Sequence, residues 1–391
     1  MRSSLKVRTL FFAIVLASLA LCVAQTTGSI PGLSLTTLDH VQGPNWWPTK
    51  GTPPANAYVG EAACVKCHAG IVATQHRTPM YHAGVRAGDS PLLAQQPGMT
   101  FHEGPYTYTI RDNTFSVSNG AAASTQPITW AFGNGENGQT YILESNGHYT
   151  ESRLSYYTSL HALDITTGHS SRIPNALEKS LGDVLKPETV QHCFSCHTTE
   201  AVVFSSFQPE KAIPGVTCEA CHGPGARHTA AMTAGQYSMA AATITNPASM
   251  SPTEAVDFCG ACHRTWSDVT MRMPANIGIV AVRFQPYRLE MSRCWGSAGD
   301  PRITCTACHN PHEPLVRTTA AYDTKCLACH RVLKDQYANE PSQPHATAPA
   351  CKVGKRDCAS CHMPRYEIPQ THASFTDHDI RIVRSRDTFP Q

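Results

Sequence analysis

The sequence predicts a fold built mostly of short α-helices and irregular loops, with one small antiparallel β insertion. Three features of the chain predict it. The 391 residues contain seven copies of Cys-x-x-Cys-His, only 41% of them are hydrophobic, and 26 Gly and 28 Pro are present. A chain of this composition has little material for a large hydrocarbon core, and its many turn-forming residues favour short elements.

The Cys-x-x-Cys-His motifs, numbered 1 to 7 in chain order, indicate covalently bound haem. In a c-type haem site the two thiols form thioether bonds and the adjacent His ligates the iron. A zinc half-site does not require a His directly after the second Cys. The chain is therefore expected to bind seven haem c groups as a multihaem cytochrome c, with the helices and loops arranged around stacked haems. The cysteines expected to form thioethers are Cys64, Cys67, Cys193, Cys196, Cys218, Cys221, Cys259, Cys262, Cys305, Cys308, Cys326, Cys329, Cys358 and Cys361. The expected proximal iron ligands are His68, His197, His222, His263, His309, His330 and His362.

The N-terminus predicts export. Basic residues at Arg2, Lys6 and Arg8 precede an apolar run at 9–24, which is short for a membrane span and typical of a signal peptide. We interpret residues 1–24 as that signal peptide and expect a periplasmic or extracellular protein. A lipid anchor at Cys22 is disfavoured, because the preceding Leu is larger than the residue such signals prefer. No later segment predicts a membrane span.

The charge balance argues against a nucleic-acid partner. The chain contains 31 Lys and Arg against 29 Asp and Glu, and removal of the signal peptide would leave 28 against 29. The expected partners are other redox proteins or cytochromes, and self-association stays open.

The motif spacing and local patterns divide the chain into segments. Motif 1 stands alone, whereas the other six crowd into the C-terminal half. Alternating residues predict strands at 106–110, 115–117, 128–132 and 140–144, and Asn146-Gly147 predicts a hairpin turn before a further strand. The expected organisation is an extended arm at 25–58, a first haem segment at 59–100, a β-rich insertion at 101–170 and a six-haem domain at 171–391.

Thirteen of the 20 histidines lie outside the motifs, which is an unusually large supply of candidate sixth ligands. Motif 1 is followed by a mixed set that also includes His76, and a Met ligand would raise the haem potential relative to His. His228 and His312 follow their own motifs too closely to reach the opposite face of the same iron, so each is a candidate for a neighbouring haem. The candidate distal ligands are Met80, His82, His192, His228, His312, His372 and His378.

Two cysteines of the expected mature chain belong to no motif. In an oxidising compartment, Cys294 and Cys351 suggest a disulfide, and two separate buried thiols are the alternative.

Several stretches resemble the cytochrome c-554-like, doubled-CXXCH multihaem cytochromes of bacteria. They are YVGEAACVKCH at 58–68, GVTCEACHGPGARH at 215–228, FQPYRLEMSRCW at 284–295, ITCTACHNPH at 303–312, YDTKCLACH at 322–330 and the segment 357–381. The resemblance implies a secreted electron-transfer protein with closely packed haems. It also implies that His228, His312 and His378 are distal ligands, and that Met80 occupies the position of the first distal ligand.

The sequence leaves three functions open. An electron carrier with closed irons is favoured. The alternatives are an enzyme that acts on a small nitrogen compound, of the nitrite or hydroxylamine type, at one open haem, and a conductive subunit that assembles into filaments. A nitrite-reductase signature in which Lys replaces the motif His is absent from the sequence.

The haem content is directly testable. Because each motif contains both thiols and its His, we expect seven haems per chain. Pyridine haemochrome absorbance relative to protein mass measures this number, and five or fewer haems would contradict the prediction.

Overall fold

The computed structural model describes residues 57–96, 98–203, 206–274, 277–295, 303–330 and 356–384, together with residues 354, 387 and 389. The expected signal peptide and almost all of the expected arm at 25–58 lie outside these residues. In the described part of the chain, no helix combines the length and the apolar character that crossing a bilayer requires.

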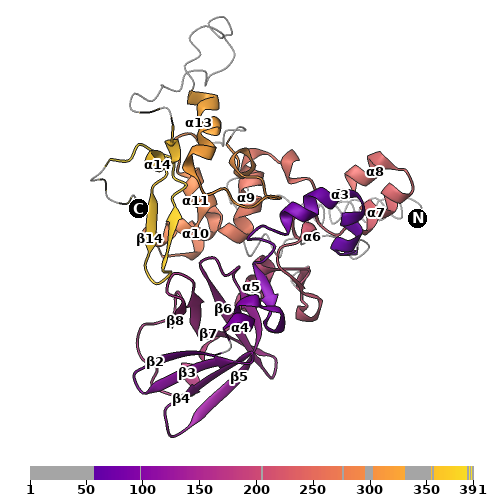
Figure 1. Cartoon of the computed structure of the whole chain (residues 1–391). Coiled ribbons are helices and arrows are strands. Elements are labelled where there is room, and N and C mark those ends of the chain that lie inside the picture. The colour runs from indigo at the N-terminus through magenta and orange to yellow at the C-terminus, as the bar shows by residue number, and fades with distance from the viewer. Residues whose placement is uncertain are drawn as a thin grey trace, which may run out of the picture. The chain divides into compact units, whose positions relative to one another are not determined.

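Among the described residues, strands follow one another without a helix at 99–165, and helices follow one another without a strand at 218–362 (Figure 1). The α-helices are α3 (Glu61–Gln75), α4 (Pro91–Gln95), α5 (Pro187–His197), α6 (Cys218–His222), α7 (Ala226–Thr233), α8 (Tyr237–Ala242), α9 (Pro252–His263), α10 (Trp266–Arg272), α11 (Gln285–Glu290), α12 (Cys305–Cys308), α13 (Asp323–His330) and α14 (Cys358–His362). The strands are β1 (Gly84–Arg86), β2 (Met99–Glu103), β3 (Tyr106–Arg111), β4 (Thr114–Ser118), β5 (Ala123–Phe132), β6 (Gly138–Ser145), β7 (His148–Tyr157), β8 (Ala162–Ile165), β9 (Gly182–Val184), β10 (Thr198–Thr199), β11 (Val202–Val203), β12 (Ser206–Phe207), β13 (Ile213–Pro214), β14 (Arg365–Ile368) and β15 (Ala373–Thr376).

The largest element is a nine-stranded antiparallel sheet. Its order is β2-β3-β4-β5-β6-β7-β8, so successive strands pair as a meander, with β1 added on β5 and β9 on β7. Figure 1 shows β2, β3, β4 and β5 side by side in one layer. Further two-stranded pairs are β10 with β13, β11 with β12, and β14 with β15.

The predicted fold class is therefore wrong, because the sheet is a major architectural element and not a small insertion. The sequence patterns identified the central strands β3 to β7. They did not identify β2, nor β1, β8 and β9, which have only three or four residues each and show too little alternation to be recognised. These short strands form because a longer partner strand is already in place.

The predicted hairpin turn is confirmed. Asn146 and Gly147 both have positive φ angles, 52° and 76°, and Ser145 pairs with His148 across the turn. Two-residue turns of this kind match the twist of antiparallel strands, and Asn-Gly adopts them at low cost.

Side chains on one face of the sheet pack together into a hydrophobic core. Buried and half-buried residues alternate along β3 and β4, as expected for strands that are covered on one side. Tyr108, Phe115, Leu143 and Leu154 are fully buried in this core. Burial of each such side chain contributes about 1.5–3 kcal/mol. The sheet therefore has a stabilising core of its own, and this core contains no CxxCH motif residue.

The opposite face carries a second core that includes CxxCH helices. Trp130 and Phe132 of β5 pack against Phe194 of α5, with ring centroids 5.2 Å apart in both pairs. Phe258 of α9 and the partly buried Cys193 belong to the same cluster. The sheet is therefore the support on which motifs 2 and 4 are placed.

Close backbone approach between β1 and α5 provides a stability test. A Cβ added at Gly84 would lie 2.5 Å from the His197 carbonyl oxygen and 3.1 Å from a ring carbon of Phe132. Gly84→Ala should destabilise the protein by about 1–3 kcal/mol through overpacking, measured as a lower Tm. Gly88→Ala is the matched control, since no atom lies within 4 Å of its added Cβ. Equal Tm values for the two variants would contradict the predicted strain.

Candidate functional site

All seven CxxCH motifs lie on or at the end of a helix. Helices α6, α12 and α14 begin at the first Cys of their motif, whereas α5, α9 and α13 end at the motif His. Motif 1 lies inside α3, where His68 departs from helical geometry and introduces a kink. A helical turn places both sulfur atoms and the imidazole within one short segment, as attachment to a single porphyrin requires.

Backbone carbonyls orient several of the expected proximal imidazoles. The Nδ1 atom of His197 lies 2.7 Å from the Ala83 carbonyl oxygen, and His222 and His362 make the same contact at 2.8 Å. A donated Nδ1–H fixes the imidazole tautomer and leaves Nε2 with its lone pair available for a metal. Phe132 also stacks on the His197 ring at 4.6 Å. These imidazoles are held as iron ligands usually are.

The sulfur atoms of different motifs lie close to one another. Direct sulfur contacts join motifs 1 and 3, 2 and 4, 4 and 5, and 6 and 7. Electrostatic influence between thiols further relates motif 3 to 4 and motif 5 to 6. The contacting pairs are Cys64 with Cys218, Cys196 with Cys262, Cys259 with Cys305, and Cys326 with Cys358. The pairs related by charge are Cys221 with Cys259 and Cys308 with Cys326. Contacts and electrostatic influence together relate all seven motifs to one another.

A buried carboxylate fastens motif 1 to motif 3. Glu219, inside motif 3, is 2% exposed and accepts hydrogen bonds from the backbone N–H groups of Val59 at 3.0 Å and Gly60 at 2.9 Å. It also accepts from Gly225 at 2.8 Å. Gly60 is the N-cap of α3, so Glu219 satisfies N–H groups at the start of a helix from another part of the chain.

Motifs 6 and 7 are joined in the same way. The carboxylate of Asp323, the first residue of α13, accepts from the backbone N–H groups of Asp357 at 2.7 Å and Cys358 at 2.8 Å. Asp357 is the N-cap of α14. The hydrogen bonds from Cys358 and then Asp357 hold the pKa of Asp323 below its usual value. In both pairs, an acid of one motif helix caps the helix that carries the other motif.

Two pairs of imidazoles have the spacing of axial ligands on a shared iron. The His222 and His312 ring centroids are 5.9 Å apart with planes only 7° from parallel, and those of His309 and His378 are 6.3 Å apart. A metal–imidazole bond is about 2 Å long, so two imidazoles on opposite sides of one metal have centroids about 6 Å apart. The paired thiols, carbonyl-bound Nδ1 atoms and these spacings fit haem c.

Local contacts engage two of the three candidate ligands near motif 1, which are His76, Met80 and His82. The Nε2 atom of His76 lies 2.6 Å from a Glu61 carboxylate oxygen, and Nε2 of His82 lies 2.8 Å from the His76 carbonyl oxygen. Met80 is half-buried, and its carbonyl oxygen accepts from the Val216 N–H at 2.9 Å. The segment that carries Met80 is therefore anchored beside motif 3.

The other candidate distal ligands differ in their surroundings. Nδ1 of His228 lies 3.0 Å from the Ala240 carbonyl oxygen, an arrangement that resembles the proximal imidazoles. Nε2 of His372 instead lies 2.8 Å from an Asp164 carboxylate oxygen, so this nitrogen is already engaged. His192 is largely surrounded by protein, and this burial lowers its pKa.

The expected Cys294–Cys351 disulfide stays a prediction, because Cys351 lies outside the described residues.

Two acids with unusual pKa values lie beside motifs 4 and 5. Burial, followed by the charge of Asp268, raises the pKa of Asp257 to about 7. Burial, followed by the charge of Asp257, raises the pKa of Glu290 to about 7. Asp257 precedes Cys259 on α9, and the contact with Cys259 lowers the pKa of Cys305, against which the charge of Glu290 acts only weakly. A change of charge in this region would therefore alter the protonation of these acids near neutral pH.

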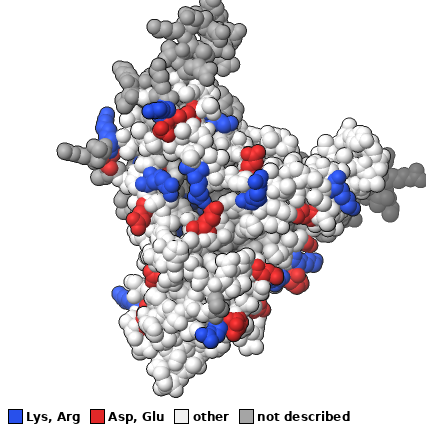
Figure 2. Space-filling view, in the orientation of Figure 1, with Lys and Arg blue, Asp and Glu red and all other residues white. Residues whose placement is uncertain are grey.

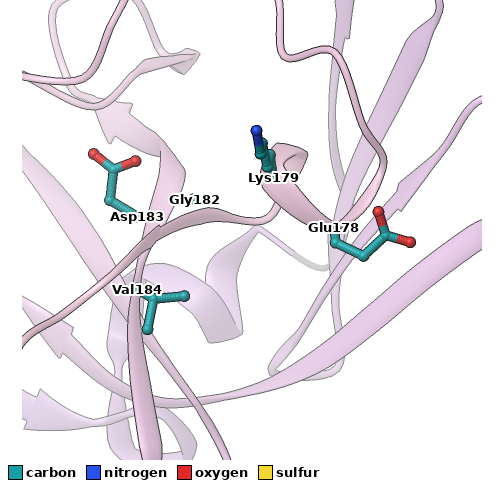
Figure 3. A pocket seen from close by; sticks show the side chains of 5 residues that line it. All are labelled: Glu178, Lys179, Gly182, Asp183 and Val184. Carbon is teal, nitrogen blue, oxygen red and sulfur yellow. The ribbon is translucent and has the colours of Figure 1, made fainter.

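The described surface shows mixed charge and a pocket beside the sheet. Basic and acidic side chains are interspersed on the face in Figure 2. A pocket next to β9 is lined by Glu178, Lys179, Gly182, Asp183 and Val184, none of which is a Cys or His (Figure 3). The pocket lies in the sheet region and includes no motif residue.

Sequence reasoning missed the residues that support the ligands. Glu219 stands inside motif 3, and Arg288, Asp377 and Asp379 lie in stretches that carry the family resemblance, but their charges alone did not reveal their partners. The available signal was the charge of Glu219 inside a cysteine-rich motif, since a charged residue at such a place needs a partner.

Comparisons with known proteins agree with the motifs. A family model for cytochrome c554 and c-prime matches residues 147–223, which include motifs 2 and 3 and confirm the expected resemblance. The chain is similar to the multihaem cytochrome MtrA of Shewanella baltica (strain OS185), with 23% identity over 214 residues that make up 52% of each protein. It therefore spans about half the length of that relative.

A solved structure is also similar. The outer cell wall cytochrome OcwA has a TM-score of 0.45 and 14% identity to this chain, over 83% of this chain and 80% of that one. The repeated haem attachment motifs, the family match and the similarity to a curated multihaem cytochrome together identify this chain as a multihaem c-type cytochrome.

Proposed function

We propose that this protein is an exported heptahaem cytochrome that transfers electrons through closely packed haems. Haem c supplies an iron that cycles between its ferric and ferrous states. The observation that carries the proposal is that sulfur contacts pair motif 1 with 3, 2 with 4, 4 with 5 and 6 with 7. Because each sulfur marks the edge of a haem attachment site, neighbouring sulfurs support neighbouring haems.

The series of neighbours is branched. Motif 4 has sulfur contacts with motifs 2 and 5 and is influenced electrostatically by motif 3, whereas motifs 1 and 7 each have one neighbour that the sulfur contacts identify. The proposed order runs from motif 1 through 3, 4, 5 and 6 to motif 7, with motif 2 joined at motif 4. This order differs from the order along the chain. A haem chain in this order would have two ends and one side branch, and electrons would enter or leave at these three places.

The protein's own side chains have two roles in this function. Imidazoles with carbonyl-bound Nδ1 atoms, such as His197 and His222, present Nε2 for ligation. Candidate distal residues would hold the iron together with these imidazoles, which would favour electron transfer over catalysis. His312 is proposed to pair with His222 and His378 with His309, on the basis of the ring spacings. His228 is proposed as a third distal ligand.

Export and partners complete the proposal. The N-terminal signal pattern supports a periplasmic or extracellular location, where other redox proteins or cytochromes would be the electron donors and acceptors. The proposed domain organisation keeps a first haem segment at 59–100, a β-rich segment at 101–170 and a six-haem domain at 171–391.

The haem of motif 1 is expected to have a Met ligand. Nearby His76 and His82 both have Nε2 engaged by oxygen atoms, so Met80 is the proposed sixth ligand. Met80→His should lower the potential of one haem and leave six nearly unchanged, because Met ligation raises the potential relative to His. Potentiometric titration of the two proteins measures this difference.

Carbon monoxide distinguishes an electron carrier from an enzyme with an open iron. The reduced wild-type protein should bind less than one carbon monoxide per seven haems. Stoichiometric binding at one haem would favour the nitrite- or hydroxylamine-type enzyme instead. An unchanged titration of Met80→His together with no carbon monoxide binding would assign a His to this iron and refute the Met80 assignment.

Glu219 should influence the haems of motifs 1 and 3. Glu219→Gln removes a buried negative charge and one of the acceptors for the N–H groups of Val59 and Gly60. Because a nearby negative charge stabilises the ferric state, its removal should raise the potential of one or two haems. The exposed Glu210→Gln is the matched control and should leave all potentials unchanged. Equal titration curves for the two variants would contradict a role for Glu219.

A further inference from the structure

The segment that follows β15 has an irregular backbone, yet two of its acids are buried. Asp377 is fully buried and Asp379 is 6% exposed. His378 lies between them, and burial, followed by the charge of His309, lowers the pKa of His378 to about 4. Consecutive polar residues without regular secondary structure remain buried only if other groups satisfy them.

Arg288 of α11 supplies the charge that these acids need. Its Nε donates to Asp377 Oδ1 at 2.8 Å, and its Nη2 donates to Asp377 Oδ2 at 2.9 Å and to Asp379 Oδ2 at 3.2 Å. Arg381 donates to Asp377 Oδ2 at 2.7 Å from the other side. The Arg288 guanidinium is 1% exposed. This one planar group donates hydrogen bonds to the residues before and after His378.

Ser292 holds the backbone of the same segment. Its Oγ donates to the His378 carbonyl oxygen at 2.8 Å and accepts from the Ile380 N–H at 2.7 Å. Arg288 and Ser292 are four residues apart, so they lie on the same side of the chain at α11 and the turn that follows it. Together they fix both the side chains that flank His378 and the peptide groups around it.

The imidazole itself is oriented by this arrangement. Nδ1 of His378 lies 3.0 Å from the Thr376 carbonyl oxygen, and its ring centroid is 6.3 Å from that of His309. His378 lies in neither a strand nor a helix, so the orientation of its imidazole depends on the contacts that neighbouring residues make.

We propose that Arg288 and Ser292 are positioning residues that hold His378 opposite His309 as the sixth ligand of the haem at motif 5. The inference rests on the proposed haem attachment at Cys305, Cys308 and His309. Arg288 would act on the iron through Asp377 and Asp379, and Ser292 through the backbone of the His378 segment. A purely structural role would instead change stability without changing the ligation of any iron.

Four holoprotein variants test the proposal. His378→Ala removes the ligand, Arg288→Lys keeps the charge but loses the forked donor geometry, and Ser292→Ala removes only the two hydrogen bonds to the segment. Arg365→Lys is the matched control, because Arg365 is exposed and donates to Ser374 in the β14–β15 hairpin of the same region. Carbon monoxide binding, the high-spin ferric signal and Tm are measured for each.

The expected results are graded. His378→Ala should bind one carbon monoxide per protein above wild type and show one new high-spin haem. Arg288→Lys and Ser292→Ala should each show a fraction of that change, and added imidazole should return the ferric haem to low spin in all three. Arg365→Lys should match wild type.

The contrary results separate the two levels of the argument. If His378→Ala gains the binding site but Arg288→Lys and Ser292→Ala lose only Tm, the positioning proposal falls while the proposed function stands. If His378→Ala gains none, His378 is not the sixth ligand and the positioning proposal falls with it. If the purified wild type carries no haem on the peptide containing motif 5, the proposed function fails in its own right. Should Arg288→Lys not accumulate, Ser292→Ala still decides the matter.

Discussion

The shortness of the haem attachment helices is the constraint on which the rest of the structure depends. Helices α6, α12 and α14 contain four or five residues, far below the length at which a helix is stable by itself. They must therefore be held from outside, by thioether bonds and by groups from distant segments. Glu219 and Asp323 provide two such anchors, since each carboxylate satisfies N–H groups at the start of another motif helix. Stability and haem spacing thus rest on the same contacts.

The sheet relieves part of this constraint. Its first face buries an independent core, so it supplies stability that does not depend on porphyrin. Its second face presents Trp130 and Phe132 to α5, and Phe132 stacks on the motif 2 imidazole. An aromatic surface fixed by strand pairing can place a ligand more accurately than a loop can, because cores are close-packed. The sheet is therefore part of the redox architecture.

Some of the buried acids near the motifs are paired with arginines, and others are not. Arg288 and Arg381 offset Asp377 and Asp379, which leaves a neutral but strongly bonded cluster near His378. Burial raises the pKa of Asp377, but the hydrogen bonds and charge of Arg288 outweigh it and hold that pKa below its usual value. At Asp257 and Glu290, by contrast, a neighbouring acid adds to the effect of burial, Asp268 at the first and Asp257 at the second, and both pKa values rise to about 7. Local charge of this kind is one of the means by which a protein tunes haem potentials.

The sequence alone determined the chemistry, because that chemistry is local. Two thiols and an imidazole within five residues define each attachment site, alternation predicted the central strands, and Asn146-Gly147 predicted its turn. Only the tertiary structure decided which motifs are neighbours, which imidazoles face one another, and that nine strands form one sheet. The Arg288 and Asp377 side chains meet across 89 residues, and Glu219 meets Gly60 across 159. No local periodicity contains such pairs, since they form only when the whole chain has closed around them.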